Sequence, residues 1–442
     1  MSAIKQSHLK QLKPLAEQHN KIPAELYDRL NVLRGLRNPD GSGVLVGLTE
    51  IGDVHGYVFD EGERLPDEGR LKYRGYRVND LVKGFQSEKR FGFEETAFLL
   101  LFGELPKQDM LKTFTNALED NRELPKNFTE DMILKIPSPD IMNKLARSVL
   151  VSYSYDDNPD DISIENVLRQ CIQLIAKLPT MAAYGYQAKS YAFYGNSLFI
   201  HQPKRGLSTS ENFLHMMRPD SSYTPLEAEL LDLCMVLHAE HGGGNNSSFT
   251  IHVVTSSDTD TYSAIASGIC SLKGPKHGGA NIKVVRMMED IKANVKDWSN
   301  EKEVSDYLVK ILQGRTFDKA GLVYGIGHAV YTKSDPRAVL LKEKAQELSR
   351  EKGREEEFNL MSLIESMAPG LFQEVKQSDK VVSANVDFYS GFVYQMLDIP
   401  ADLYTPIFAM ARVAGWSAHR IEEIVSGGRI IRPAYRCIAP SR

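Results

Sequence analysis

The sequence predicts a mainly α-helical protein, and three observations lead to that class. Most segments carry helix-start signals or apolar residues at helical spacing, strand signals are few, and no internal repeat is present. The chain has 442 residues, which is long enough for a large core and for two or three domains. Hydrophobic residues make up 42% and charged residues 25%, a balance typical of globular proteins that argues against disorder.

The clearest helix signal lies in residues 224–241, TPLEAELLDLCMVLHAEH. Thr224 is a favoured N-cap, Pro225 suits the first turn, and Glu227 completes a capping box. Four leucines then recur at helical spacing. We therefore expect a well-defined helix that ends close to two histidines.

Further helices are predicted along the second half of the chain. They cover residues 259–272, 281–295, 334–353, 391–397 and 406–425. The third of these begins with SDPR, and Ser334 is its expected N-cap. Strand signals are confined to short hairpin pieces within residues 43–59 and 70–76.

Charge and hydropathy exclude several classes of protein. The net charge is −5 and the pI is about 6.2, so no basic surface for nucleic acid or an anionic membrane is expected. No apolar run approaches the roughly 18 residues of a membrane span. Residues 1–23 lack both the apolar core of a signal peptide and the arginines of a transit peptide. We expect a cytoplasmic protein with no nucleic-acid or membrane partner, and its four cysteines as buried free thiols.

Three glycine-rich segments each adjoin a histidine, and this coincidence directs the search for a site. The first is LHAEHGGGNNSS, with His238 and His241 three residues apart at a helix end. His238 could simply offset the helix dipole there. A zinc site is a further alternative, although H-A-E-H is not the H-E-x-x-H spacing and lacks a nearby cysteine.

The second segment is LKGPKHGGANIKV, which contains His277. Its glycines allow a ligand to approach the backbone closely. The helix that follows would direct its N-terminus at the loop and keep the histidine neutral. A neutral histidine can donate a hydrogen bond to a developing oxyanion. The alternative is an ordinary turn histidine in solvent.

The third segment, VYGIGHAVYTKSDPR, spans residues 323–337. It is neither a dinucleotide-binding fingerprint, because the third glycine would fall at Val330, nor a P-loop. What remains is a turn that carries His328, Lys333 and Arg337. Such a turn suits an acidic ligand with a flat part against the backbone.

Three charged residues near the C-terminus complete the set. Asp387 precedes a helical segment, so it is either an N-cap or a buried general base. Arg412 lies within an apolar helix and needs an acidic partner in the protein or an anionic ligand. Arg432 lies beside Pro433 in the tail.

Taken together, these segments resemble the citrate synthase family. The motifs that carry the resemblance run in the family order from about residue 45 to the tail: YRGYRVNDLV, FEETAFLLLFGELP, LHAEHGGGNNS, GPKHGGAN, GIGHAVYTKSDPR, NVDFYSG, FAMARVAGWSAH and IIRP. The first forty residues and residues 107–225 carry little that matches. The long pattern G-x-G-H-A-V-x-x-x-x-D-P-R makes a chance match improbable.

The resemblance implies a mainly α, two-domain fold with the active site in the cleft. Its large domain would comprise residues 1–279 and 391–442, and its small domain residues 280–390. It implies a homodimer that condenses acetyl-CoA with oxaloacetate through an enolate and hydrolyses citryl-CoA to citrate and CoA, the entry reaction of the tricarboxylic acid cycle. Acetyl-CoA would be a co-substrate, and no permanently bound cofactor or metal is implied.

The resemblance also implies a role for each candidate residue. Asp387 would remove the methyl proton, His277 would donate to the thioester oxygen, and His328 would donate to the ketone of oxaloacetate. The substrate-binding set would be His241, Arg337, Arg412 and Arg432, with Arg432 supplied by the partner subunit. The CoA-binding set would be Val323, Gly325, Gly327 and Lys333. The family often has a basic residue at the position of Thr332, so a phosphate contact there would shift to Lys333.

Two alternatives stay open at this point. A 2-methylcitrate synthase would use propionyl-CoA with the same catalytic groups, because one methylene changes discrimination by only about 1–3 kcal/mol. A non-catalytic sensor of CoA or a dicarboxylate would use the same scaffold, but all three catalytic positions are intact here.

Overall fold

Helices make up most of the structure, a computed structural model that describes residues 6–61 and 63–439. The mainly α class predicted from the sequence is confirmed. The chain forms two compact units, one up to Leu48 and one from Thr49 onward. The first unit holds α1 (Gln6–His19), α2 (Glu25–Arg29) and a single 3-10 turn, Arg34–Leu36.

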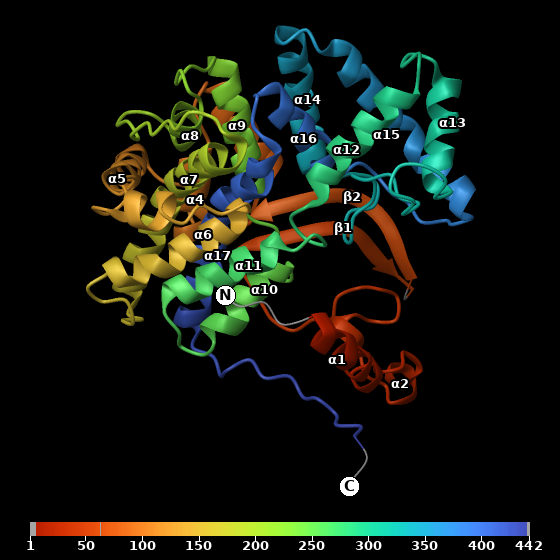
Figure 1. Cartoon of the computed structure of the whole chain (residues 1–442), viewed down its shortest axis with the longest axis horizontal. Coiled ribbons are helices and arrows are strands. Elements are labelled where there is room, and N and C mark those ends of the chain that lie inside the picture. The colour runs from red at the N-terminus through yellow and green to blue at the C-terminus, as the bar shows by residue number, and fades with distance from the viewer. Residues whose placement is uncertain (1–5, 62, 440–442) are drawn as a thin grey trace. The chain divides into compact units, whose positions relative to one another are not determined.

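The second unit carries every candidate site residue and consists of a hairpin and a series of helices (Figure 1). Its elements are β1 (Gly52–Asp60), β2 (Glu63–Tyr73), β3 (Tyr76–Arg77), α3 (Val78–Ser87), α4 (Phe93–Phe102), α5 (Gln108–Asp120), α6 (Ile141–Ser152), α7 (Ile164–Tyr194), α8 (Thr209–Met217), α9 (Pro225–His238), α10 (Asn246–Thr255), α11 (Thr261–Lys273), α12 (Ala280–Asn294), α13 (Glu301–Leu312), α14 (Pro336–Glu351), α15 (Glu355–Lys376), α16 (Val386–Met396) and α17 (Tyr404–Ser426). Short π or 3-10 segments lie at Thr129–Leu134, Tyr153–Tyr155 and Ala401–Leu403.

The hairpin is longer than the sequence predicted. β1 and β2 pair antiparallel from Gly52 opposite Tyr73 to Asp60 opposite Glu63, with an irregularity between His55 and Tyr57. The strands start later than residue 43, the expected beginning. Their alternation of half-buried and exposed positions is weak, which explains why the sequence showed only fragments.

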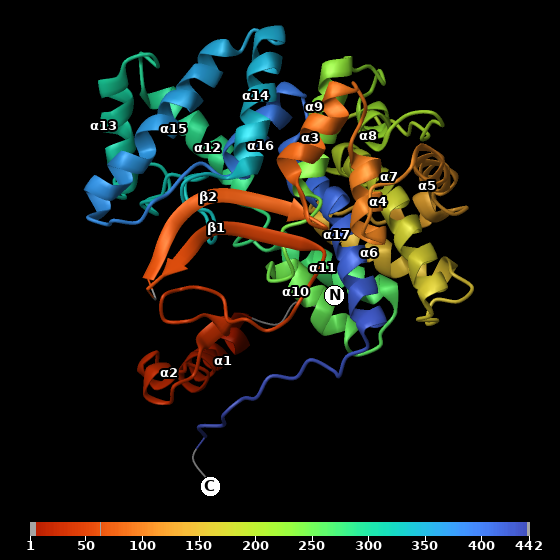
Figure 2. The same ribbon diagram turned by 180° about the vertical axis from the view of Figure 1, so that it is seen from behind.

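Helix α17 lies at the centre of the second unit. It packs against α4, α7, α9, α10 and α11, and Figure 2 shows it between these helices. Its side chains from Ala409 to Arg420 are buried. A helix surrounded on all sides must be apolar on all sides, so the buried Arg412 within it stands out.

Helices α12 to α16 form a second group, which lies on one side of the hairpin in both views. α13 packs on α15, whereas α12 and α14 both pack on α16. Residues 280–390 therefore contain α12 to α15 and the first residues of α16, which continues unbroken to Met396. The division into a large and a small domain stays a prediction.

Most predicted helix ends agree with the structure, with one correction. α9 begins with the expected capping box of Thr224 and Glu227. The predicted N-cap of α14 was wrong, because Asp335 and not Ser334 accepts from the amide of Arg337, at 3.0 Å. The hydroxyl of Ser334 instead accepts from the amide of Gly69 in the hairpin, at 3.1 Å. Ser334 thus joins two distant segments and does not cap the helix.

The four cysteines are free, as expected, but not all are buried. Cys171 and Cys234 are buried, whereas Cys270 and Cys437 are exposed. Burial of Cys270 was a wrong prediction, because α11 turns that position away from the core.

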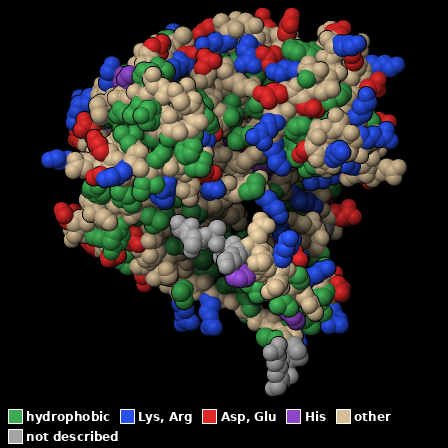
Figure 3. All heavy atoms as spheres, in the orientation of Figure 1, with side chains coloured by type: hydrophobic (Ala, Val, Ile, Leu, Met, Phe, Trp, Pro, Cys, Tyr) green, Lys and Arg blue, Asp and Glu red, His purple; other side chains and the backbone are tan. Residues whose placement is uncertain are grey.

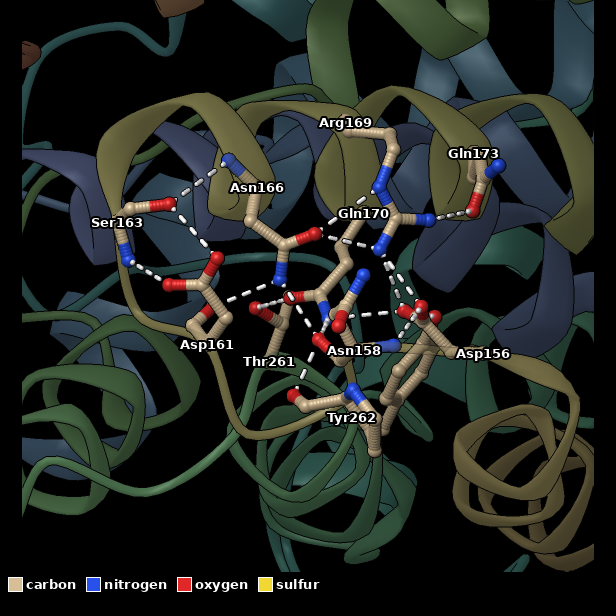
Figure 4. Close-up of polar contacts among 11 residues, drawn as sticks. Asp156, Asn158, Asp161, Ser163, Asn166, Arg169, Gln170, Gln173, Thr261 and Tyr262 are labelled. Carbon is tan, nitrogen blue, oxygen red and sulfur yellow. Dashed lines mark hydrogen bonds and ion pairs between the residues drawn. The ribbon is translucent and has the colours of Figure 1, made fainter.

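A buried polar network anchors the start of α7, in the part of the chain that matched no motif (Figure 4). The carboxylate of Asp156 accepts from Arg169 at 2.7 and 2.8 Å, from Gln170 at 2.9 Å and from the hydroxyl of Tyr262 at 2.7 Å. Burial opposes its charge, but these donors lower the pKa of Asp156 to about 2. The network links α7 to α11, so a structural role accounts for these polar residues.

The surface agrees with the composition. On the face in Figure 3, acidic and basic side chains are interspersed over much of the surface. Among the described residues, no helix is both long enough and apolar enough to cross a membrane.

Candidate functional site

The loop that carries His328 is bonded to the segment that leads into Asp387. The amide of Asn385 donates to the carbonyl of Gly325 at 2.8 Å, and its side-chain amide donates to the carbonyl of Gly327 at 2.8 Å. His328 follows this bonded segment directly, and Asp387 lies two residues beyond Asn385. The two predicted catalytic residues are therefore brought to the same region by backbone hydrogen bonds.

Two glycines of this loop are required by its shape. Gly325 and Gly327 have φ of +81° and +97°, a region that side chains strongly disfavour. A Cβ on Gly325 would also lie 2.8 Å from the ring of Phe388 in α16. The glycines thus allow the loop to pack against the start of α16, and their predicted contact with CoA stays a prediction.

Asp387 is not the N-cap of α16. Asn385 is the cap, and its side-chain oxygen accepts from the amide of Asp387 at 3.0 Å. Burial raises the pKa of Asp387 to about 6, with the charges of Arg337 and Arg412 opposing that rise and Asp335 reinforcing it. A half-buried carboxylate with this pKa is ionised at neutral pH and can accept a proton.

His328 is a neutral donor. Its Nδ1 accepts from the amides of Val330 at 3.0 Å and Tyr331 at 3.1 Å. The single ring proton must therefore lie on Nε2. Burial, helped by Arg337, lowers the pKa of His328 to about 4, so the ring is neutral at physiological pH.

His277 is neutral as well, and one of its ring nitrogens contacts a serine. Its Nε2 lies 3.1 Å from the hydroxyl of Ser247, which accepts from Trp416 at 3.1 Å and donates to Asn245 Oδ1 at 2.9 Å. For the ring to carry its proton on Nδ1 and donate from there, the Ser247 hydroxyl has to turn its proton from Asn245 to Nε2. Burial first, and Arg412 second, lower the pKa of His277 to about 4.

The two histidines at the end of α9 are buried and neutral. His238 packs against Phe408 with ring centroids 4.6 Å apart, and the ring of His241 lies 5.2 Å from that of His328. Burial, Arg337 and other neighbouring charges lower the pKa of both rings well below the usual value. His238 thus carries no charge to offset the helix dipole. In the described part of the chain, neither ring belongs to a group of three metal-ligating side chains, which counts against the zinc alternative.

Arg412 is fully buried and largely without partners. Its Nε donates to the carbonyl of His238 at 2.6 Å. Both terminal nitrogens are buried and have no hydrogen-bond partner among the described residues, and no carboxylate in that part of the chain lies within ion-pair distance. Burial lowers the pKa of Arg412 to about 10, which still leaves it charged. The internal salt bridge considered from the sequence is absent from the described residues, although the carboxylate of Glu240 acts on Arg412 from beyond ion-pair distance. The two terminal nitrogens are therefore available to an anionic ligand.

Arg337 is buried too, but it has its own counter-ion. Its Nε and Nη2 donate to the two oxygens of Asp335 at 3.0 and 2.8 Å. Although burial opposes its charge, this carboxylate raises the pKa of Arg337 above its usual value. The two hydrogen bonds to Asp335 do not use Nη1 of Arg337. The guanidinium also lies 5.4 Å from the ring centre of Tyr331.

Arg432 is not brought to this site by its own chain. It is exposed in the extended tail after α17, where the neighbouring amide of Ile431 donates to Ser256 at 3.0 Å. Figure 1 shows this tail leaving the helices. Its contribution from a partner subunit stays a prediction.

Electrostatic interactions show that the predicted residues share one region. The charge of Arg412 acts on His241, His277 and Asp387, and His241 also responds to His328. Three side chains, from the loops after α9 and α11 and from the start of α16, are thus within electrostatic reach of a guanidinium with unpaired donors, and His328 lies beside one of them.

The predicted CoA-binding residues differ in their surroundings. Val323 is buried, whereas Lys333 is exposed and open to a ligand. Thr332, at the position where a basic residue was expected, hydrogen-bonds to the hairpin: its hydroxyl contacts the carbonyl oxygen of Gly56 and donates to that of Asp67 at 3.0 Å. Thr332 therefore holds the loop, which leaves Lys333 as the basic residue of this stretch that faces solvent.

Comparison with known proteins identifies the family. The model described as "Citrate synthase, C-terminal domain" matches residues 40–434. The chain belongs to the citrate synthase family. The resemblance drawn from the sequence motifs is thereby confirmed.

Individual relatives agree with this assignment. A citrate synthase from Synechocystis sp. is 35% identical over 370 residues, which cover 83% of this chain and 84% of the relative. A protein named 2-methylcitrate synthase 1, from Corynebacterium glutamicum, is 32% identical over 400 residues, with coverage of 89% and 92%. The crystal structure of citrate synthase from Pyrobaculum aerophilum superposes with a TM-score of 0.73 at 31% identity, covering 92% of this chain and 95% of that one. The citrate-synthase-like fold is therefore confirmed, whereas the acyl-CoA used is not decided by these similarities.

Several residues of this citrate synthase family member were missed by sequence reasoning. Tyr331 packs between His328 and His241, with ring centroids 4.8 and 5.5 Å away. Phe408 lies under the guanidinium of Arg412 at 4.7 Å. Asp335 pairs with Arg337. The only sequence signal was their presence inside the quoted motifs. Spacing alone does not reveal which aromatic ring or carboxylate contacts a given arginine.

Proposed function

We propose that this protein condenses acetyl-CoA with oxaloacetate and hydrolyses the resulting citryl-CoA to citrate and CoA. The observation that carries the proposal is the buried guanidinium of Arg412. Its two terminal nitrogens have no hydrogen-bond partner among the described residues, and three neutral histidines and one carboxylate lie near it. A small dicarboxylate satisfies such donors. Membership of the citrate synthase family supports the same substrates.

Oxaloacetate is proposed to bind through its two carboxylates. Arg412 donates from both terminal nitrogens, which match the two oxygens of a carboxylate. Arg337 adds its remaining terminal nitrogen, and His241 directs its unpartnered Nε2 toward the ligand. Arg432 from the partner subunit of a homodimer completes the set.

Asp387 is proposed as the general base for the methyl proton of acetyl-CoA. The side chain is half-buried, so water solvates the carboxylate less well than it solvates a free one. With a pKa of about 6 it is ionised at neutral pH, and the pKa is close enough to neutrality for efficient proton transfer. Positioned proton transfer of this kind contributes about 10²–10⁴ in rate.

Two neutral histidines are proposed to stabilise the oxygens on which negative charge develops. His277 donates from Nδ1 to the thioester oxygen once the Ser247 hydroxyl turns its proton from Asn245 to Nε2 of the ring. His328 donates from Nε2 to the ketone oxygen, because its Nδ1 is already an acceptor. Both rings have a pKa of about 4, so they donate without being acids in the resting enzyme.

The CoA moiety is proposed to lie along the loop from Val323 to Gly327, with Lys333 near its phosphates. Residues 280–390 would act as a small domain that closes this loop over the large-domain residues. Support comes from the bonds that couple the loop to the start of α16, since they move His328 and Asp387 as one piece.

The second candidate is a 2-methylcitrate synthase, favoured by the similarity to the Corynebacterium relative of that name. The deciding experiment measures thiol release from acetyl-CoA and from propionyl-CoA in the presence of oxaloacetate. A higher kcat/KM for acetyl-CoA supports the first proposal, and a clear preference for propionyl-CoA supports the second. Absence of thiol release with either acyl-CoA would favour a non-catalytic sensor.

The shared site can be tested by complementation. Arg432→Leu chains and Asp387→Asn chains should each be inactive alone. When they are mixed and re-associated, heterodimers should regain activity, because one site then receives an intact arginine and an intact carboxylate. No recovery after confirmed subunit exchange would contradict a site built from two subunits.

A further inference from the structure

A second histidine cluster lies outside the proposed active site, between α10 and α17. His252 of α10 and His419 of α17 face each other with Nε2 and Nδ1 3.1 Å apart. Glu422 Oε2 lies 3.8 Å from His419 Nδ1. The three ligating atoms all lie within 4.8 Å of one another.

The outer nitrogen of each ring is held by a carboxylate. His252 Nδ1 lies 2.8 Å from Glu423, and His419 Nε2 lies 3.0 Å from Glu240. Ionised carboxylates only accept, so each ring carries its proton on that outer nitrogen. This is the arrangement in which carboxylates orient metal-ligating histidines and increase their basicity.

The inner nitrogens can then be bridged in two ways, by a proton or by a metal ion. Although burial opposes its charge, the carboxylates of Glu240 and Glu422 raise the pKa of His419 to about 9, so a proton is the competing occupant. Nitrogens bound to one tetrahedral zinc ion at roughly 2.0–2.1 Å stand about 3.3 Å apart, close to the spacing seen here. Glu422 Oε1 accepts from the amide of Glu50 at 2.8 Å, whereas its buried Oε2 has no hydrogen-bond partner among the described residues and faces the pair.

Charge favours a cation as well. Three carboxylates, those of Glu240, Glu422 and Glu423, surround the two imidazoles. Gly243 lies beside the rings: a Cβ there would be 3.6 Å from His419 Cε1 and 3.7 Å from His252 Nε2. A side chain at this position would contact both rings, and glycine avoids that contact.

We propose that His252 Nε2, His419 Nδ1 and Glu422 Oε2 form a binding site for a divalent transition-metal ion, with Glu423 and Glu240 orienting the two histidines. Imidazole nitrogens with one carboxylate suit zinc or cobalt. The side chains of His252 and Glu422 are 13% and 15% exposed, so an ion can reach the site from solvent. The bound ion would link α10 to α17.

The test uses the full-length protein after treatment with a chelator, and Co²⁺ as the probe. We expect one equivalent of Co²⁺ to give the visible absorption of a tetrahedral site and Zn²⁺ to displace it. His252→Ala should abolish the absorption, and Glu422→Gln should weaken binding. Glu423→Gln should weaken binding by about 10–100-fold, the usual effect of losing a carboxylate that orients a ligating histidine.

A matched control is His201→Ala. His201 contacts the carbonyl of Pro219 at 2.9 Å and lies beside another histidine, His215, but no carboxylate contacts it in the described structure. Co²⁺ binding should be unchanged in this variant. The proposal is overturned if the parent binds no Co²⁺, which would mean that a shared proton joins the two rings. It is also overturned if His252→Ala is folded, as judged by circular dichroism, and binds Co²⁺ as well as the parent. If that variant does not fold, the milder Glu423→Gln decides: unaltered affinity overturns the proposal.

Discussion

Two buried arginines near the candidate site differ in what surrounds their charges. Arg337 at the start of α14 forms two hydrogen bonds with Asp335, two residues earlier in the chain. Arg412 in the middle of α17 donates once, to a backbone carbonyl, and both its terminal nitrogens lack partners in the described structure. A buried charge without a counter-ion is costly. The comparison teaches that one buried arginine, Arg337, is paired within the fold, whereas the other keeps unpaired donors, to which we propose that a ligand binds.

Substitution of Asp387, whose pKa is raised by burial and lowered by both arginines, gives the largest expected effect. Asp387→Asn should lower kcat by about 10²–10⁴, because asparagine cannot accept the methyl proton. The melting temperature should fall by no more than about 2–4 °C, since the change is isosteric and Asn385 already caps the helix. Steady-state kinetics and thermal unfolding test this.

The matched control for that variant is Asp140→Asn. Asp140 is a true N-cap, that of α6, and accepts from the amide of Asn143 at 2.6 Å. Asparagine caps about as well, so both kcat and stability should be unchanged. If Asp387→Asn kept the parent rate of deuterium exchange at the methyl of bound acetyl-CoA, the base would have to be another group.

Breaking the satisfied pair should cost stability. Arg337→Met leaves the buried carboxylate of Asp335 without its counter-ion and should lower the free energy of unfolding by about 3–5 kcal/mol. The melting temperature should fall by roughly 6–15 °C. The double variant with Asp335→Asn should recover part of the loss. A single variant as stable as the parent would contradict the role given to the pair.

Removing the unsatisfied arginine should affect binding and not stability. Arg412→Met should raise KM for oxaloacetate by about 10–150-fold, the equivalent of a lost charged hydrogen bond of roughly 1.5–3 kcal/mol. KM for acetyl-CoA should change little. The melting temperature should stay the same or rise, because an unpaired buried charge is replaced by an apolar side chain. A large loss of stability would show that Arg412 is structural, like Arg337.

The pH dependence of kcat/KM gives the smallest effect, and it tests whether the charge of Arg412 acts on Asp387. Asp387 must be ionised to act, so kcat/KM should fall about tenfold per pH unit below its pKa of about 6. His277 and His328, with a pKa of about 4, stay neutral in that range and add no second limb. In Arg412→Met the limb should move to higher pH, because the positive charge that favours the ionised carboxylate is gone.

The sequence by itself predicted the helical class and the capped start of α9, and it supplied the residues that we propose for the site. These features depend on local chemistry: a Thr-Pro-x-Glu start caps its own helix, and glycine beside histidine marks a turn wherever the chain places it. The order of the motifs along the chain also indicated the family.

Only the tertiary structure decided which charges are satisfied. Asp335 and Asp387 both stand at the beginning of a helix, yet one caps and pairs with an arginine while the other is left with a raised pKa. His252 and His419 lie 167 residues apart and showed no metal-ligand spacing. Burial and long-range contacts set pKa values and hydrogen-bond partners, and neither is encoded in the local pattern of residues. The sequence therefore listed the groups of the site, and the packing of α17 against α9 and α10 determined what each group can do.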